Sequence, residues 1–106
     1  MERDELERIF CWKINSELKL FKYRMLQKEK EEIYSMAYRI DCIISIYELL
    51  MELCKELAEE ELKQLMSIPE VLAHLYQRWM KEPDSKNEEL EQSIRMTIRE
   101  MNREAA

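Results

Sequence analysis

The residues with catalytic potential in this chain are few and widely spaced. His74 is the only histidine, and Glu70 lies four residues before it, which places both on one face of a helix. Such a pair could form one edge of a metal site or relay a proton. A di-iron bundle needs Glu-x-x-His on two helices, and zinc needs three or four Cys or His ligands. We therefore interpret Glu70 and His74 as a surface pair.

The other reactive residue types fit structural roles. Cys11, Cys42 and Cys54 have no Cys-x-x-Cys spacing and are odd in number, as expected for reduced, buried thiols in a cytoplasmic protein. The adjacent glutamates 59–61 point around a helix and cannot converge on one substrate atom; they suit a solvated helix start. The chain contains no glycine, which excludes phosphate-binding loops and dinucleotide fingerprints. We predict a protein without enzymatic activity, metal or cofactor.

The charge distribution is uneven. The net charge is −6, which disfavours non-specific binding to duplex nucleic acid. Residues 11–30 hold six basic and two acidic side chains, a local charge of +4, whereas residues 48–61 hold six acidic side chains and one lysine, a local charge of −5. The two blocks could pair within the fold or with a partner. An acidic block of this kind could mimic phosphates in a basic groove.

Apolar spacing predicts helices that position these charges. Apolar residues recur every three or four positions in segments 3–27, 31–53, 58–66, 68–80 and 86–103, as on the buried face of a helix. Residues 1–106 should form one all-α domain, a compact bundle of four to five helices of unequal length. Ile9, Trp12 and Leu20 widen the apolar stripe of the first helix, so this helix should touch more than one neighbour. Segment 40–54 is apolar nearly all round and lies either at the centre of the bundle or under a second subunit.

Local signals set the later boundaries. Ser67 with Glu70, and Ser85 with Glu88, fit capping boxes at two helix starts. Pro83 should end the helix before it. Segment 56–81 is a helix, a tight turn and a second helix, similar to a helix-turn-helix whose second helix would enter a DNA groove. The turn lacks small residues, and the glutamates before it would repel phosphates.

No segment predicts a membrane span, because the richest apolar run, 40–54, contains charged residues. The first five residues carry acidic side chains and lack the pattern of a secretory signal. The sequence therefore predicts a cytoplasmic protein.

The order of elements from Ile33 to Ile98 is similar to that of a family of small bacterial proteins of unknown function, carried largely by phages and mobile elements. The resemblance rests on Ala37-Tyr38 and the helix that follows them, on the run 56–66, and above all on Pro-x-x-Leu-Ala-x-x-Tyr-x-x-Trp from Pro69 to Trp79. Those proteins look like compact helical bundles without an assigned activity. The resemblance implies a mobile-element setting, in which acidic helical proteins often act by binding, for example as inhibitors of a host defence nuclease such as a CRISPR effector.

These observations predict a non-enzymatic binding or regulatory protein that acts through protein–protein contact; the alternative is a DNA-binding transcriptional regulator that uses segment 56–81. Homodimerisation through the first or second helix stays open, as does the identity of the partner. The candidate partner-binding residues are the acidic block and two aromatic residues near the end of the fourth helix: Glu52, Glu56, Glu59, Glu60, Glu61, Tyr76 and Trp79.

Overall fold

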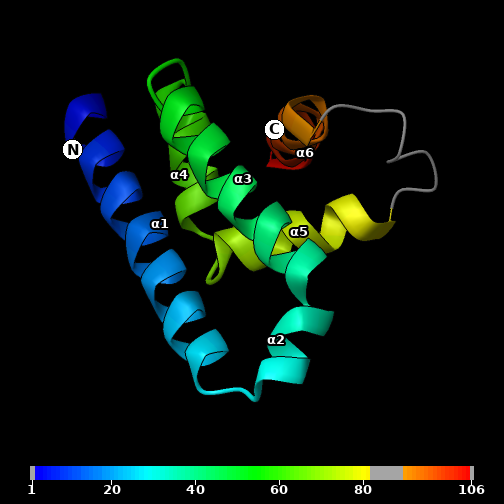
Figure 1. The fold of residues 1–106 in the computed structure, drawn as a ribbon. Coiled ribbons are helices and arrows are strands. Elements are labelled where there is room, and N and C mark those ends of the chain that lie inside the picture. Colours follow the sequence, from blue (N-terminus) through cyan, green and yellow to red (C-terminus); the bar gives the residue numbers. More distant parts are fainter. Residues whose placement is uncertain (1, 82–89, 106) are drawn as a thin grey trace.

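A computed structural model describes residues 2–81 and 90–105. Every regular element among them is an α-helix, which confirms the all-α class (Figure 1). The helices are α1 (Arg3–Leu26), α2 (Lys30–Ser35), α3 (Ala37–Leu53), α4 (Glu59–Met66), α5 (Val71–Lys81) and α6 (Leu90–Ala105). The described residues thus hold six helices, where the sequence predicted four to five. The additional helix arises because the predicted helix 31–53 is broken at Met36.

The break at Met36 separates α2 from α3. Met36 has φ −101° and ψ 13°, outside the regular helical range. Just before it, the Ser35 hydroxyl donates a hydrogen bond of 2.7 Å to the carbonyl of Glu32, and such back-bonding competes with continuation of a helix. The apolar pattern runs through this position without a glycine or proline, so periodicity alone predicted one continuous helix.

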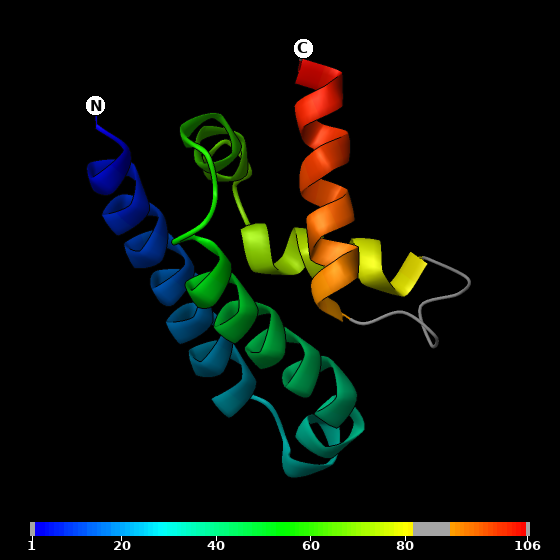
Figure 2. The ribbon, with the colours of Figure 1, turned by 90° about the horizontal axis from the view of Figure 1, so that it is seen from above.

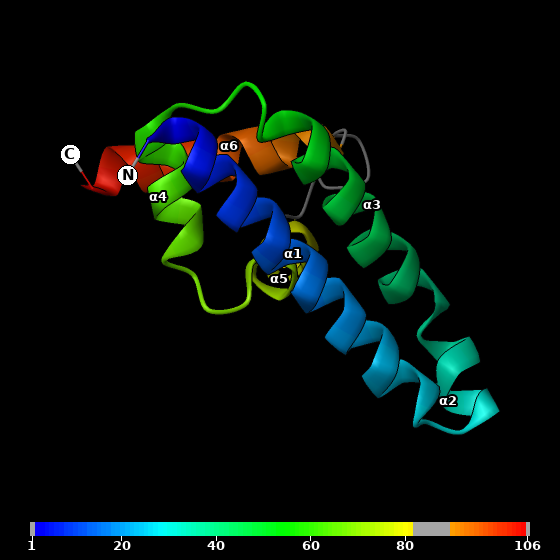
Figure 3. The same ribbon diagram turned by 90° about the vertical axis from the view of Figure 1, so that its left-hand side faces the viewer.

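The long helices α1 and α3 run side by side in opposite directions, with α2 at the turn between them (Figures 2 and 3). Helix α5 packs against both α1 and α3, and α6 packs on α3, α4 and α5. Helix α1 lies at one edge of the molecule (Figures 1 and 2). Helix α3 is central in the bundle, because it contacts α1, α2, α5 and α6. This was one of the two positions that the sequence allowed for segment 40–54.

The core forms where the apolar stripes of these helices meet. It is built mostly from leucine and isoleucine with one phenylalanine at its centre, and its fully buried members include Phe10, Ile14, Ile46, Leu50, Leu62, Leu65 and Val71. Burying a side chain of this size stabilises the fold by about 1.5–3 kcal/mol. In α1 the buried residues recur at every fourth position, Leu6, Phe10, Ile14 and Leu18, so only one side of this helix faces the core.

Contacts distant in sequence fix the helix ends. The Arg3 guanidinium donates to the carbonyls of Cys54, Lys55 and Leu57 at 2.8–2.9 Å and so closes the turn after α3. The predicted capping box at Ser67 is wrong: Ser67 ends α4, and its hydroxyl donates to the Gln64 carbonyl. Helix α5 begins later, at Val71. Pro83 and the predicted capping box of Ser85 and Glu88 lie outside the described residues.

Candidate protein-contact surfaces

Within the described part of the chain, the histidine, cysteine and acidic side chains do not gather into a metal-binding cluster. His74 is exposed on α5. Within residues 2–81 and 90–105, no three His, Cys, Asp or Glu side chains lie together in a way that could hold a metal ion. None of the helices described is both long and apolar enough for a transmembrane segment.

The cysteines include one close pair. The Sγ atoms of Cys11 and Cys54 lie 3.4 Å apart, and all three cysteines are free thiols. The Cys54 thiol also donates to the Met51 carbonyl at 3.2 Å. Burial, together with the neighbouring Cys11 thiol, raises the pKa of Cys54 from 9.0 to about 12. Because only a thiolate is an effective nucleophile, the raised pKa lowers the reactivity of Cys54.

The acidic block is spread over α3, α4 and the turn between them, and much of it is paired within the chain. Arg95 of α6 lies 3.3 Å from Glu56 and 3.9 Å from Glu91. Lys63 lies between Glu59 and Glu60, at 3.4 and 4.0 Å.

The remaining two glutamates of the candidate set differ in role. The Glu61 carboxylate accepts the Ala58 N–H at 2.9 Å and so caps α4. Glu52 is exposed near the end of α3. The block is therefore a partly neutralised surface, and its role in partner binding stays a prediction.

Tyr76 and Trp79 are core residues in this structure. Their exposed fractions are 9% and 8%. The Trp79 indole donates to the Tyr38 hydroxyl at 3.1 Å, and the Arg39 guanidinium lies 5.3 Å from the centre of the Tyr76 ring. These contacts join α5 to the first turn of α3. The burial does not support the prediction that the two aromatic side chains anchor a partner.

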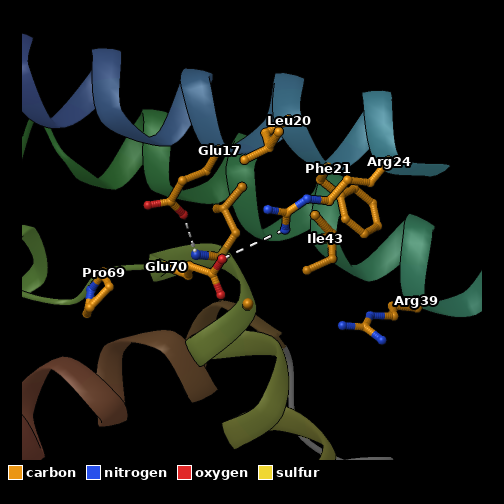
Figure 4. A pocket seen from close by; sticks show the side chains of 10 residues that line it. Glu17, Leu20, Phe21, Arg24, Arg39, Ile43, Pro69 and Glu70 are labelled. Carbon is orange, nitrogen blue, oxygen red and sulfur yellow. Dashed lines mark hydrogen bonds and ion pairs between the residues drawn. The ribbon is translucent and has the colours of Figure 1, made fainter. Parts of the chain in front are cut away.

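A small pocket lies where α1, α3 and the start of α5 meet (Figure 4). Its volume is about 260 Å³, and its walls include Phe21, Ile43, Arg24 and Arg39. Arg24 lies 3.9 Å from Glu70 across the mouth of the pocket. The charged side chains that line the pocket are two acidic and two basic ones: Glu17, Glu70, Arg24 and Arg39.

Beside this pocket, two side chains of α1 form hydrogen bonds with the backbone at the start of α5. Glu17 accepts the backbone N–H of Leu72 at 2.9 Å, and Lys13 donates to the carbonyl of Pro69 at 2.9 Å. Lys13 and Glu17 are themselves paired at 3.1 Å. The N-terminal cap of α5 is therefore supplied by a helix more than fifty residues earlier, where the sequence had suggested Ser67.

The outer face of α1 carries large apolar side chains that no other part of the described structure covers. Here we call Ile9, Trp12, Ser16, Leu20 and Tyr23 the outer stripe. Its four apolar members are 39%, 71%, 47% and 62% exposed, in chain order. Successive members are three or four residues apart, so all five lie on one side of the helix, opposite Leu6, Phe10, Ile14 and Leu18. A hollow lined by Glu5, Arg8, Ile9 and Trp12 opens on the same side.

The sequence predicted from Ile9, Trp12 and Leu20 that the first helix touches more than one neighbour. Helix α1 does pack against α3, α4 and α5, but it does so through the face of Leu6, Phe10, Ile14 and Leu18, while Ile9, Trp12 and Leu20 are exposed. The signal that could have separated the two faces is the regular four-residue step from Leu6 to Leu18, which already supplies one complete buried face. A second apolar series on the same helix then has no place in the core.

No known protein family, curated protein or solved structure matches this chain.

Proposed function

We propose that this chain is a non-enzymatic binding protein that acts by protein–protein contact through the outer stripe of α1. The observation that carries the proposal is the exposure of Trp12, at 71%, within a row of apolar side chains. Scattered exposed apolar residues are normal in folded proteins, but four large ones aligned along one face of a helix, on both sides of Ser16, are typical of an interaction surface. Tryptophan and tyrosine are also the side chains that most often dominate binding energy at such surfaces.

The setting proposed for this activity is a phage or other mobile element, with a host defence nuclease such as a CRISPR effector as one candidate target. This setting rests on the resemblance to small mobile-element proteins that the sequence of segment 33–98 suggested. The exposed Glu52 and the ion-paired Glu56, Glu59 and Glu60 offer a second surface, suited to a basic groove. Because ion pairs within the chain already occupy much of that surface, the outer stripe is the stronger candidate contact.

A capture experiment tests the proposal. The tagged chain, its Trp12→Glu variant and a Tyr34→Glu control are used as baits in a lysate of the cells that carry the gene. Tyr34 is 86% exposed on α2, away from the outer stripe. We expect a partner retained by the wild-type and control baits and lost by Trp12→Glu. Equal capture by all three baits would contradict the proposal, and loss only in a Glu52→Lys/Glu60→Lys variant would assign binding to the acidic surface.

DNA binding through α5 is the second candidate. Helices α4 and α5 are separated by residues 67–70, and His74, Gln77 and Lys81 form an exposed row on α5. Arg78, which would have supplied a further positive charge, is paired with Glu100 of α6. An electrophoretic shift measured between ~50 and ~200 mM salt tests this candidate, because phosphate contacts weaken steeply with salt. A shift that disappears in a Lys81→Glu variant would favour it over protein binding.

A further inference from the structure

The outer stripe has an internal symmetry. Ile9 and Tyr23 each lie seven residues from Ser16, on opposite sides, and Trp12 and Leu20 each lie four residues from it. A two-fold axis at Ser16 would therefore place Ile9 opposite Tyr23 and Trp12 opposite Leu20 of a second, antiparallel helix. Such self-complementarity is what an isologous dimer interface requires, because each surface must match itself after a rotation of 180°.

The hollow beside Trp12 fits this arrangement. Its lining residues, Glu5, Arg8, Ile9 and Trp12, have the spacing i, i+3, i+4 and i+7, which forms the hole that receives a side chain from a facing helix. In the antiparallel register set by Ser16, the side chain opposite this hole is Tyr23 of the second copy. Tyr23 is 62% exposed and combines a flat apolar ring with a hydroxyl that suits the charged rim of the hole.

The charges along α1 favour the antiparallel orientation. Residues 2–8, at the start of α1, hold four acidic and two basic side chains, a net charge of −2, whereas residues 19–26, at its end, hold three basic side chains and no acidic one. An antiparallel pair brings the acidic end of each helix to the basic end of the other, and the two helix dipoles also oppose each other favourably. The small side chain at Ser16 permits close approach where the helices cross.

From this symmetry, hollow and charge pattern we infer that the occupant of the outer stripe is a second copy of this chain, bound antiparallel through α1 about a two-fold axis at Ser16. The inference rests on the proposed function, since it names the partner of the same surface. It predicts a dimer that presents two copies of every other surface, including α5 and the acidic block. Two linked copies bind a repeated or symmetric target more tightly than one copy does.

Sedimentation equilibrium tests the inference. At roughly 100 µM, above the dissociation constants of many small interfaces, the wild-type chain should sediment with twice the mass of one chain. Tyr23→Glu should halve the mass, and Tyr34→Glu should not change it. Circular dichroism of each variant separates loss of association from loss of folding. A wild-type chain that sediments as one chain at this concentration overturns the inference.

Two further measurements test the geometry. A Ser16→Cys variant treated with diamide should form a covalent dimer, while the wild-type chain, which keeps Cys11, Cys42 and Cys54, should not. The dissociation constant should rise with salt, because the negatively charged end of each α1 lies beside the positively charged end of the other; tightening with salt would overturn the antiparallel orientation. If the chain is monomeric but Trp12→Glu still loses a partner from the lysate, this inference falls and the proposed function stands. If Trp12→Glu changes neither the sedimentation mass nor the capture of a partner, both this inference and the proposed function fall.

Discussion

Replacing Glu17 should lower the stability of the protein, because Glu17 of α1 holds the first turn of α5 through the Leu72 N–H. The Glu17 side chain is 15% exposed; it accepts the Leu72 N–H at 2.9 Å and lies 3.1 Å from the Lys13 ammonium. In Glu17→Ala, the Leu72 N–H loses its only acceptor among the described residues, and Lys13 loses its charged partner. The first turn of α5, with Val71 and Leu72 in the core, should then be held by apolar packing alone.

The size of the effect follows from these contacts. Loss of a helix N-terminal cap costs about 1 kcal/mol, and a buried donor left without a partner costs about 1–3 kcal/mol. Both values describe the same hydrogen bond, so we expect Glu17→Ala to lower the free energy of unfolding by about 2 kcal/mol. For a domain of this size this corresponds to a fall in Tm of ~10 °C. Glu17→Gln keeps an acceptor oxygen and should lose about half as much.

Thermal and urea unfolding followed by circular dichroism measure the effect. Glu31→Ala is the matched control, because Glu31 is an exposed glutamate in the first turn of α2 and its replacement should change the stability by less than about 0.5 kcal/mol. A Glu17→Ala variant as stable as the control would refute the assignment of Glu17 as the cap of α5.

Three other perturbations test the placement of particular side chains. Arg3→Met removes the three bonds to carbonyls after α3 and should cost about 2 kcal/mol in urea unfolding; a loss below about 0.5 kcal/mol would show that Arg3 does not close that turn. The raised pKa of Cys54, about 12 against 9.0, means that its neutral thiol stabilises the fold fully below pH 9 and that this contribution is lost as the pH rises to 12. Guanidinium unfolding should therefore show a steeper decline over that range in the wild-type chain than in Cys54→Ala, by at most about 1.4 kcal/mol per pH unit; parallel declines would argue against burial of the thiol. Trp12 should account for most of the quenching of tryptophan fluorescence by acrylamide, since Trp79 is buried and bonded to Tyr38. Quenching should thus fall in Trp12→Phe and persist in Trp79→Phe. The reverse pattern would show that Trp79 is the exposed indole and Trp12 the buried one.

The sequence predicted the helical class because the underlying signal is local. The four-residue steps of α1 and the apolar run of α3 specify helix without reference to any other element. Boundaries were less predictable where tertiary contacts decide them. Ser67 has the residue type of a cap, but the acceptor at the start of α5 is Glu17, more than fifty residues earlier.

The candidate site was only partly predictable for the same reason. Tyr76 and Trp79 were predicted as candidate partner anchors because aromatic side chains often dominate the binding energy of an interface. In the structure they contact Tyr38 and Arg39 of α3. The spacing of residues along one helix cannot predict a contact with another helix. The apolar residues of the outer stripe could equally have belonged to a wide buried face of α1. Only the packing of the other helices shows which face of α1 is covered.

The most direct test of a dimer formed through the outer stripe is the sedimentation mass of the wild-type chain beside that of Trp12→Glu, at one concentration and salt. The account predicts a two-chain mass for the wild type and a one-chain mass for a folded Trp12→Glu. Equal masses for the two proteins would contradict it.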